Sequence, residues 1–190
     1  MTILDTVLGA LGEEQTRDLA QRVGAEPGQI SSGIQLALPM LVSALARNAS
    51  DGDGARALHA ALDEHQGASL DKMRDHGSLD VDDGRRMLGH ILGQQEDQAA
   101  EAVSQVSGLD TRAASQLLTM LAPLVLGALA RLRHQHDLDA AATADALRQE
   151  RDAIPQKVPG LAAVLANMPG RDGDGSPVDD LSALLGGRGS

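Results

Sequence analysis

The chain has 190 residues, enough for one well-buried domain, and its apolar content of 42% is close to the average of globular proteins. It contains no Phe, Tyr or Trp, so the core must be built from aliphatic side chains and any small-molecule pocket would lack aromatic walls. A net charge of −11 disfavours binding to nucleic acid and to anionic membranes. The absence of cysteine excludes disulfides, thiol nucleophiles and thiolate metal sites.

The sequence carries no segment that we expect to cross a membrane or to act as a secretory signal. Its first residues, Met1 to Asp5, are acidic where a signal peptide would be basic. The most apolar window, residues 117–130, is shorter than the roughly 20 residues of a spanning helix. We therefore expect a cytoplasmic protein.

Two parts of the chain repeat each other at an offset of 84 positions, the distance from Pro39 to Pro123. Two pairs of segments align at this offset: residues 19–24 with 103–108, and residues 38–47 with 122–131. A shared period with proline in register indicates one structural unit that is used twice.

In the first half of the chain, apolar residues recur at the spacing that is typical of amphipathic or buried helices. This spacing predicts helices over residues 3–11, 14–23, 27–36, 40–47 and 55–62. Gly24 closes the second helix, and Pro27 opens the third because the first turn needs no donor. Pro39 is expected to restart or kink the chain before residues 40–47, whose almost entirely apolar sequence predicts a buried helix.

The second half follows the same order after a charged connector over residues 67–84. The predicted helices cover residues 85–93, 97–107, 111–121, 124–133, 139–148 and 160–168. Asp110 is the expected N-cap of the third of these, and Pro123 opens the fourth, which is the counterpart of the first buried helix.

We predict an all-α fold, a multihelical bundle built from two repeated helix-turn-helix-like (homeodomain-like) units, near residues 14–62 and 98–148. One domain would cover residues 1–169, and residues 170–190 would form a flexible acidic, glycine-rich tail. That tail ends in a short amphipathic segment, in which Asp179 and Asp180 precede three leucines at helical i, i+3 and i+4 spacing: Leu181, Leu184 and Leu185. The segment is either a docking element or a frayed terminus.

Several of these motifs, taken in order, resemble the bacterial YidB-like family, a domain-of-unknown-function family. The resemblance rests on four segments: Asp83-Gly84, Met87 to Gly93, Ser107 to Asp110, and Leu121 to Leu129. It covers roughly residues 1–150 and the glycine-rich tail. It implies an all-helical bacterial protein with homeodomain-like helix packing, and it supplies no catalytic residues.

The helix-turn-helix spacing is the strongest argument for a nucleic-acid function. Ala20, Gly24 and Ile30 have this spacing, and Ser104, Gly108 and Ala114 repeat it. DNA recognition would need basic side chains on the second helix of each pair. The side chains that these helices offer are mostly neutral: Gln29, Ser31, Ser32 and Gln35 in the first copy, and Arg112, Ser115 and Gln116 in the second. We therefore favour a structural helix pair.

Two acidic stretches resemble the start of calcium loops, namely residues 80–84 and 172–176. An EF-hand needs glycine at its sixth position and glutamate at its twelfth. The chain has Arg85 and Ile91 at those positions of the first stretch, and Pro177 and Ala183 in the second. Both stretches are therefore interpreted as solvated turns.

Of the six histidines, His90 is the most interesting because it lies between apolar neighbours in a glycine-flanked segment. We interpret it as a partly buried histidine that bonds a loop carbonyl, in preference to a ligand or catalytic residue. The chain has no HExxH, no GxSxG, no phosphate-binding glycine loop and no dinucleotide fingerprint. We predict a protein that is not an enzyme, with no cofactor and no metal site.

The leading function hypothesis is a helical scaffold that binds a protein partner or itself through aliphatic helix faces. The residues that we single out for such an interaction are Leu181, Leu184, Leu185 and His90. The alternative is a nucleic-acid-associated regulator that uses the helix-turn-helix-like pairs. One continuous basic face would favour that alternative, built from Arg112, Arg131, Arg133 and Arg148.

Overall fold

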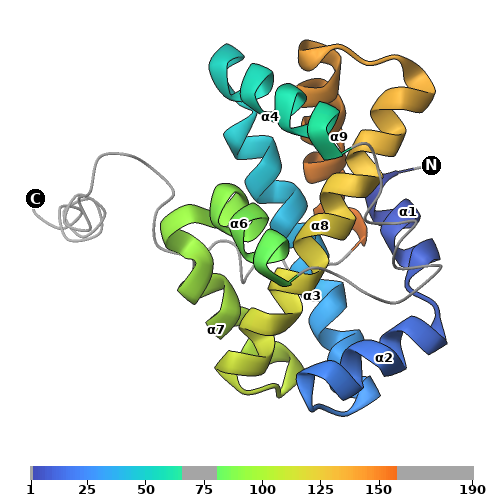
Figure 1. Cartoon of the computed structure of the whole chain (residues 1–190), viewed down its shortest axis with the longest axis vertical. Helices are drawn as coiled ribbons and strands as arrows, with labels where there is room; N and C mark the ends of the chain where they lie inside the picture. The colour runs from blue at the N-terminus through green and yellow to red at the C-terminus, as the bar shows by residue number, and fades with distance from the viewer. Residues whose placement is uncertain (1, 66–80, 158–190) are drawn as a thin grey trace, which may run out of the picture.

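A computed structural model describes residues 2–65 and 81–157, and it contains no β-strand in these two ranges (Figure 1). The elements are α1 (Ile3–Ala10), α2 (Glu13–Val23), α3 (Pro27–Asn48), α4 (Gly52–His65), α6 (Val81–Leu92), the 3-10 turn η1 (Gly93–Gln95), α7 (Glu96–Ser107), α8 (Thr111–His136) and α9 (Ala140–Lys157). The predicted all-α class is confirmed.

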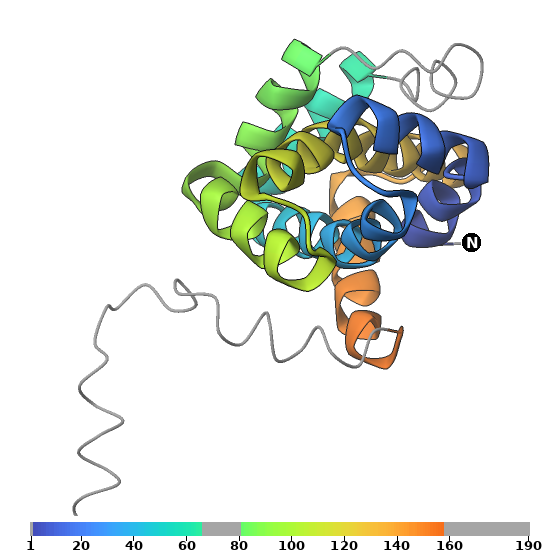
Figure 2. The ribbon, with the colours of Figure 1, turned by 90° about the horizontal axis from the view of Figure 1, so that it is seen from below.

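Helices α3 and α8 form the centre of the bundle, and the other helices pack around them (Figure 2). Every residue from Leu36 to Ala46 in α3 is buried, and so is every residue from Leu117 to Ala130 in α8. A helix that is apolar on all sides must be buried on all sides. The prediction that residues 40–47 and 124–133 belong to one core is confirmed for residues 40–46 and 124–130.

The same two helices are also long and apolar enough to cross a membrane, by length and composition alone. In the bundle, 78% of the most apolar window of α3 and 89% of that of α8 are buried against other helices. Core helices of globular domains have this property too.

Side-chain and glycine caps define several helix ends. At α1, the Asp5 backbone amide donates to the Thr2 hydroxyl, and the Thr2 amide donates to the Asp5 carboxylate. Asp110 caps α8 by accepting from the Ala113 amide at 2.7 Å. Helices α2 and α7 both end at a left-handed glycine, Gly24 and Gly108, with φ of 74° and 75°.

The two internal prolines do not divide their helices, and this corrects the prediction. The sequence predicts that Pro39 restarts or kinks the chain and that Pro123 opens a new helix, but α3 and α8 each continue through the proline. An interior proline costs a helix about 3 kcal/mol because it removes a hydrogen bond and crowds the preceding turn. The apolar side chains around both prolines are buried, and leaving the helix there would expose several of them to water.

Other differences concern helix ends. Helix α6 begins at Val81, so residues 81–84 belong to a helix and not to the solvated turn that we expected. Helices α8 and α9 run on to His136 and Lys157, beyond the predicted ends at residues 133 and 148. The predicted helix 160–168, the second acidic stretch 172–176 and the tail 170–190 lie outside the described residues.

Two glycines permit close contacts of other helices with α8. A Cβ atom at Gly33 of α3 would lie 2.7 Å from Leu117 Cδ2 of α8. A Cβ atom at Gly84 of α6 would lie 2.4 Å from the Thr119 backbone oxygen of α8. In a core without aromatic side chains, such close approaches bring the backbones near enough for aliphatic side chains to fill the space.

Candidate interaction groove

A groove of about 970 Å³ opens between the end of α3, helix α4 and helix α6, and we call it the α4–α6 groove. In Figure 1, α4 lies above α6, and these two helices make little contact with each other. A groove of this volume is large enough to bind a drug-sized molecule or a short peptide segment.

The floor of the groove is apolar and comes from three helices. It consists of Leu45 of α3, Met87 and Ile91 of α6, and Leu126 of α8. Each of these residues is at most 7% exposed, so the floor is part of the core. On the α4 side the wall is made of small or aliphatic residues, including the exposed Ala57 and Ala61 and the half-buried Leu58.

Asn48, at the end of α3, holds α6 in place beside the groove. Its side-chain amide donates to the backbone oxygens of His90 and Ile91, both at 3.0 Å. These carbonyls belong to the last turn of α6, where helical carbonyls lack partners within the helix. Asn48 therefore satisfies the end of α6 and fixes its position relative to α3.

Arg47 lies on the rim and has a neutral hydrogen-bond partner. Its Nη2 donates to Gln95 Oε1 at 2.6 Å, and it forms no ion pair with a carboxylate among the described residues. Partial burial lowers the pKa of Arg47 from its ordinary value, because burial disfavours the charged form. The guanidinium nevertheless stays charged at neutral pH, so it is a cation beside an apolar floor without an anionic partner there.

The other charged groups of the rim are already engaged. Arg86 forms an ion pair with Asp83 one turn earlier in α6, at 3.3 Å. Asp51 caps the start of α4 by accepting from the Gly54 amide at 2.6 Å. Arg47 therefore differs from Arg86 in forming no ion pair with a carboxylate among the described residues.

His90 is exposed, which corrects our interpretation of it as partly buried. Its backbone carbonyl accepts from Asn48, and the residue lines the groove. The structure therefore places one of the four predicted interaction residues at this groove. The other three, Leu181, Leu184 and Leu185, lie outside the described residues.

Two side chains of the first helix-turn-helix-like pair, Gln29 and Ser32, form hydrogen bonds inside the fold. Gln29 accepts from the Glu26 amide at 3.2 Å and donates to the Gly108 backbone oxygen at 2.7 Å, so it joins the two glycine turns. Ser32 donates to the Gly28 carbonyl in its own helix. Neither side chain is held ready to contact a base.

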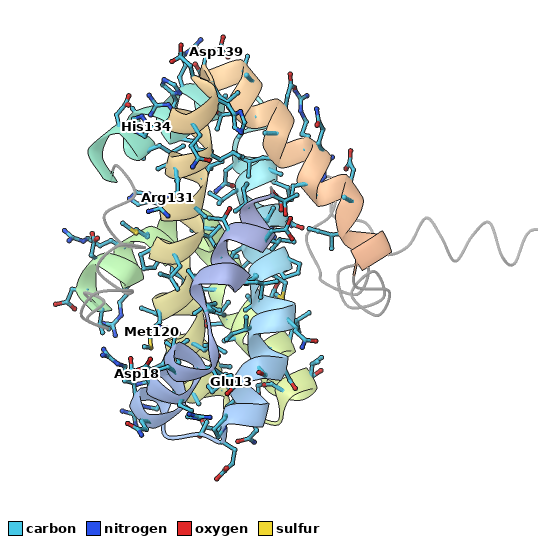
Figure 3. All side chains as sticks on the ribbon, turned by 90° about the vertical axis from the view of Figure 1, so that its right-hand side faces the viewer. Glu13, Asp18, Met120, Arg131, His134 and Asp139 are labelled. Atoms are coloured by element: carbon cyan, nitrogen blue, oxygen red, sulfur yellow. The ribbon has the colours of Figure 1, made fainter. Side chains whose placement is uncertain are left out.

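The four arginines of the predicted basic face do not lie together. Arg112 is at the start of α8, about 28 Å along the helix from Arg131. Figure 3 shows Arg131 and His134 on the half of α8 that lies away from Asp18 of α2. Arg133 forms an ion pair with Asp63 at 2.6 Å, and Arg148 forms one with Asp145.

No group of three or more histidine, aspartate or glutamate side chains that could hold a metal ion occurs in residues 2–65 and 81–157. The groove itself was not anticipated as a site. Its residues come partly from the polar stretch that follows Arg47 and begins at Asn48, and partly from the glycine-flanked segment around His90. Neither pattern indicates that the two segments meet.

Comparisons with known proteins give one match. A family model described as "Bacterial protein of unknown function (DUF937)" matches residues 5–132, a range that includes every described residue lining the groove. The YidB-like name suggested by the sequence motifs is not part of that match. No curated protein and no solved structure matches the chain.

Proposed function

Since the chain belongs to the DUF937 family of bacterial proteins of unknown function, we propose from its groove that it is a non-catalytic, cytoplasmic interaction protein. In this proposal, the α4–α6 groove binds an apolar segment of a protein that carries acidic residues. The observation that carries the proposal is an open apolar floor beside Arg47, a cation whose hydrogen-bond partner is a neutral amide.

The chemistry of the groove supports binding more than catalysis. Besides Arg47 and the exposed His90, its polar groups are an amide that caps α6, an aspartate that caps α4 and an Asp83–Arg86 ion pair. These groups stabilise helices, and they do not form a nucleophile with an adjacent base. An apolar floor with a polar rim is typical of surfaces that bind an amphipathic helix.

The proposal includes two further points on architecture. The turn glycines Gly24 and Gly108, like Pro39 and Pro123, are 84 positions apart. We infer from this spacing that α2–α3 and α7–α8 are two copies of one helix-turn-helix-like unit. The burial of α3 and α8 inside the bundle supports a soluble, cytoplasmic protein.

The alternative, a nucleic-acid-associated regulator, has less support. The net charge is −11, the arginines on α8 are spread along its length, and Gln29 is engaged between the two turns. Because phosphate contacts depend on cations, we expect no submicromolar binding to duplex DNA at physiological salt. A fluorescence anisotropy titration tests this. Submicromolar affinity that falls steeply with added salt would favour the regulator over the interaction protein.

The groove is tested with a variant that places a charge on its wall. Ala57 is exposed, so Ala57→Glu should leave the fold intact while a carboxylate enters the groove. Ala141→Glu adds the same charge to an exposed position of α9, away from the groove, and is the matched control. Both variants should unfold at nearly the temperature of the unmodified chain.

The readout is affinity capture from the source bacterium, followed by a binding titration with the purified partner. We expect the unmodified chain and Ala141→Glu to bind the partner equally, and Ala57→Glu to lose at least tenfold in affinity, because a buried unpaired carboxylate is costly. Equal binding by all three chains would show that the α4–α6 groove is not the interaction site.

A further inference from the structure

The α4–α6 groove raises the question of which segment occupies it. We propose that it binds residues 178–185 of this same protein, with Leu181, Leu184 and Leu185 against the floor and Asp179 and Asp180 toward Arg47. This inference rests on the proposed function, because it names the occupant of the same groove. Residues 178–185 lie outside the described residues, so only their sequence enters the argument.

The first reason is the match between apolar surfaces. The floor of the groove is a continuous patch contributed by α3, α6 and α8, and it faces a space of about 970 Å³. Leucines at i, i+3 and i+4 fall on one face of a helix. An amphipathic segment laid into an apolar groove is a common mode of peptide recognition, and aliphatic anchors at this spacing are its signature.

The second reason is charge. Arg47 donates to the neutral Gln95 side chain and has no carboxylate partner among residues 2–65 and 81–157. Hydrogen bonds between a guanidinium and a carboxylate are about twice as strong as neutral ones. Asp179 and Asp180 directly precede the three leucines, so one segment supplies both the apolar face and the anion. Residues 160–168 are also apolar at helical spacing but contain no acidic residue, so they lack the second feature.

The third reason is reach. Helix α9 ends at Lys157, and residues 158–177 form a connection of 20 residues to the segment. Fully extended, they span about 66 Å, and with residues 160–168 in the helix that the sequence predicts they still span about 50 Å. A compact domain of this size has a radius of gyration of about 15 Å, so the connection reaches any face of it. A flexible linker gives an effective concentration on the order of millimolar, so an intrinsic dissociation constant of about 0.1 mM would keep the groove roughly nine-tenths occupied.

The test uses the full chain and its lack of cysteine. Ser176→Cys creates a single thiol just before the segment, and a nitroxide attached there broadens the NMR signals of nearby amides. We expect broadening of amides that line the groove, such as those of Ala57, Ala61 and His90, and none at α2 on the far side of the bundle.

A matched pair of substitutions in the segment separates binding from chance proximity. Leu184→Asp removes an anchor from the apolar face, whereas Ala183→Asp adds the same charge on the opposite side of the helix. The broadening at the groove should disappear with Leu184→Asp and persist with Ala183→Asp. Substituting Arg47→Gln should weaken it. Mixing a tagged chain with an untagged, isotope-labelled chain shows whether the segment binds its own domain or a second copy, and either result supports the proposal.

Broadening that is absent, or that lies away from the groove, would overturn the proposal. Equal broadening in the Leu184→Asp and Ala183→Asp chains would do the same. The experiments distinguish a failure of this proposal from a failure of the proposed function. If the tag leaves the groove unaffected while Ala57→Glu loses an external partner, the groove binds another protein and only the assignment of residues 178–185 is wrong.

Discussion

The position of α6 on α8 depends on Gly84, and the substitution Gly84→Ala tests this most directly. The added Cβ would lie 2.4 Å from the Thr119 backbone oxygen, closer than real Cβ contacts come, and 3.3 Å from the Thr119 Cγ2, which is tighter than most such contacts. Overpacking of this kind costs about 1–3 kcal/mol. We expect the upper end because the atom struck belongs to the backbone of a buried helix. Alanine recovers about 1 kcal/mol of helix propensity, which leaves a net destabilisation of about 2 kcal/mol.

The matched control is Gly89→Ala in the same helix. Gly89 is exposed, and a Cβ atom added there would have no neighbour within 4 Å, so alanine adds helix propensity without a clash. We expect Gly84→Ala to lower the melting temperature by about 4–8 °C and Gly89→Ala to raise it by about 2–4 °C. Because the chain has no aromatic residue, unfolding must be followed by far-ultraviolet circular dichroism. If Gly84→Ala stabilises the protein as much as Gly89→Ala does, α6 does not pack on α8 through Gly84.

Three further predictions concern stability. Leu41→Ala, at a fully buried position of α3, should cost about 2–5 kcal/mol in urea unfolding, and an effect below about 0.5 kcal/mol would show that the core is elsewhere. Replacing either Gly24 or Gly108 by alanine should cost about 1 kcal/mol, because both have positive φ; the double variant should show whether the two costs add. Glu150 accepts from the Ile3 and Leu4 amides at 2.8 and 2.9 Å, so Glu150→Ala should accelerate hydrogen exchange throughout α1, and unchanged exchange there would argue against this cap.

Local signals in the sequence predicted most helices and several of their ends. Gly24 and Gly108 stop α2 and α7 because a left-handed residue closes the last turn, and Asp110 starts α8 by accepting a hydrogen bond from an early amide. These effects act within a few residues, so one sequence is sufficient to recognise them. The prolines were misjudged because their effect depends on what the rest of the protein buries. At Pro39 and Pro123, tertiary packing outweighs the local cost of an interior proline.

The groove could not be predicted in the same way. It requires Asn48 to meet the last turn of α6, 42 positions later in the chain, and no local pattern specifies that contact. His90 was singled out by its glycine-flanked position, but its exposure depends on how α6 rotates against α3 and α8. Arg47 is the last residue of an apolar run, and no local pattern indicates that its guanidinium bonds the neutral side chain of Gln95, 48 positions later.

The composition of the chain also explains why a groove of this size is left open. Gly84 lets α6 approach the backbone of α8, and Gly33 does the same between α3 and α8, so these helices pack closely with aliphatic side chains alone. Helix α4 faces the groove with Ala57 and Ala61, which are too short to reach across to Met87 and Ile91 of α6. In most proteins a Phe or Trp could fill such a space, and this chain has neither. A segment with leucines at helical spacing would fill this space without aromatic residues. Carboxylates beside those leucines would form an ion pair with Arg47, which has none among residues 2–65 and 81–157.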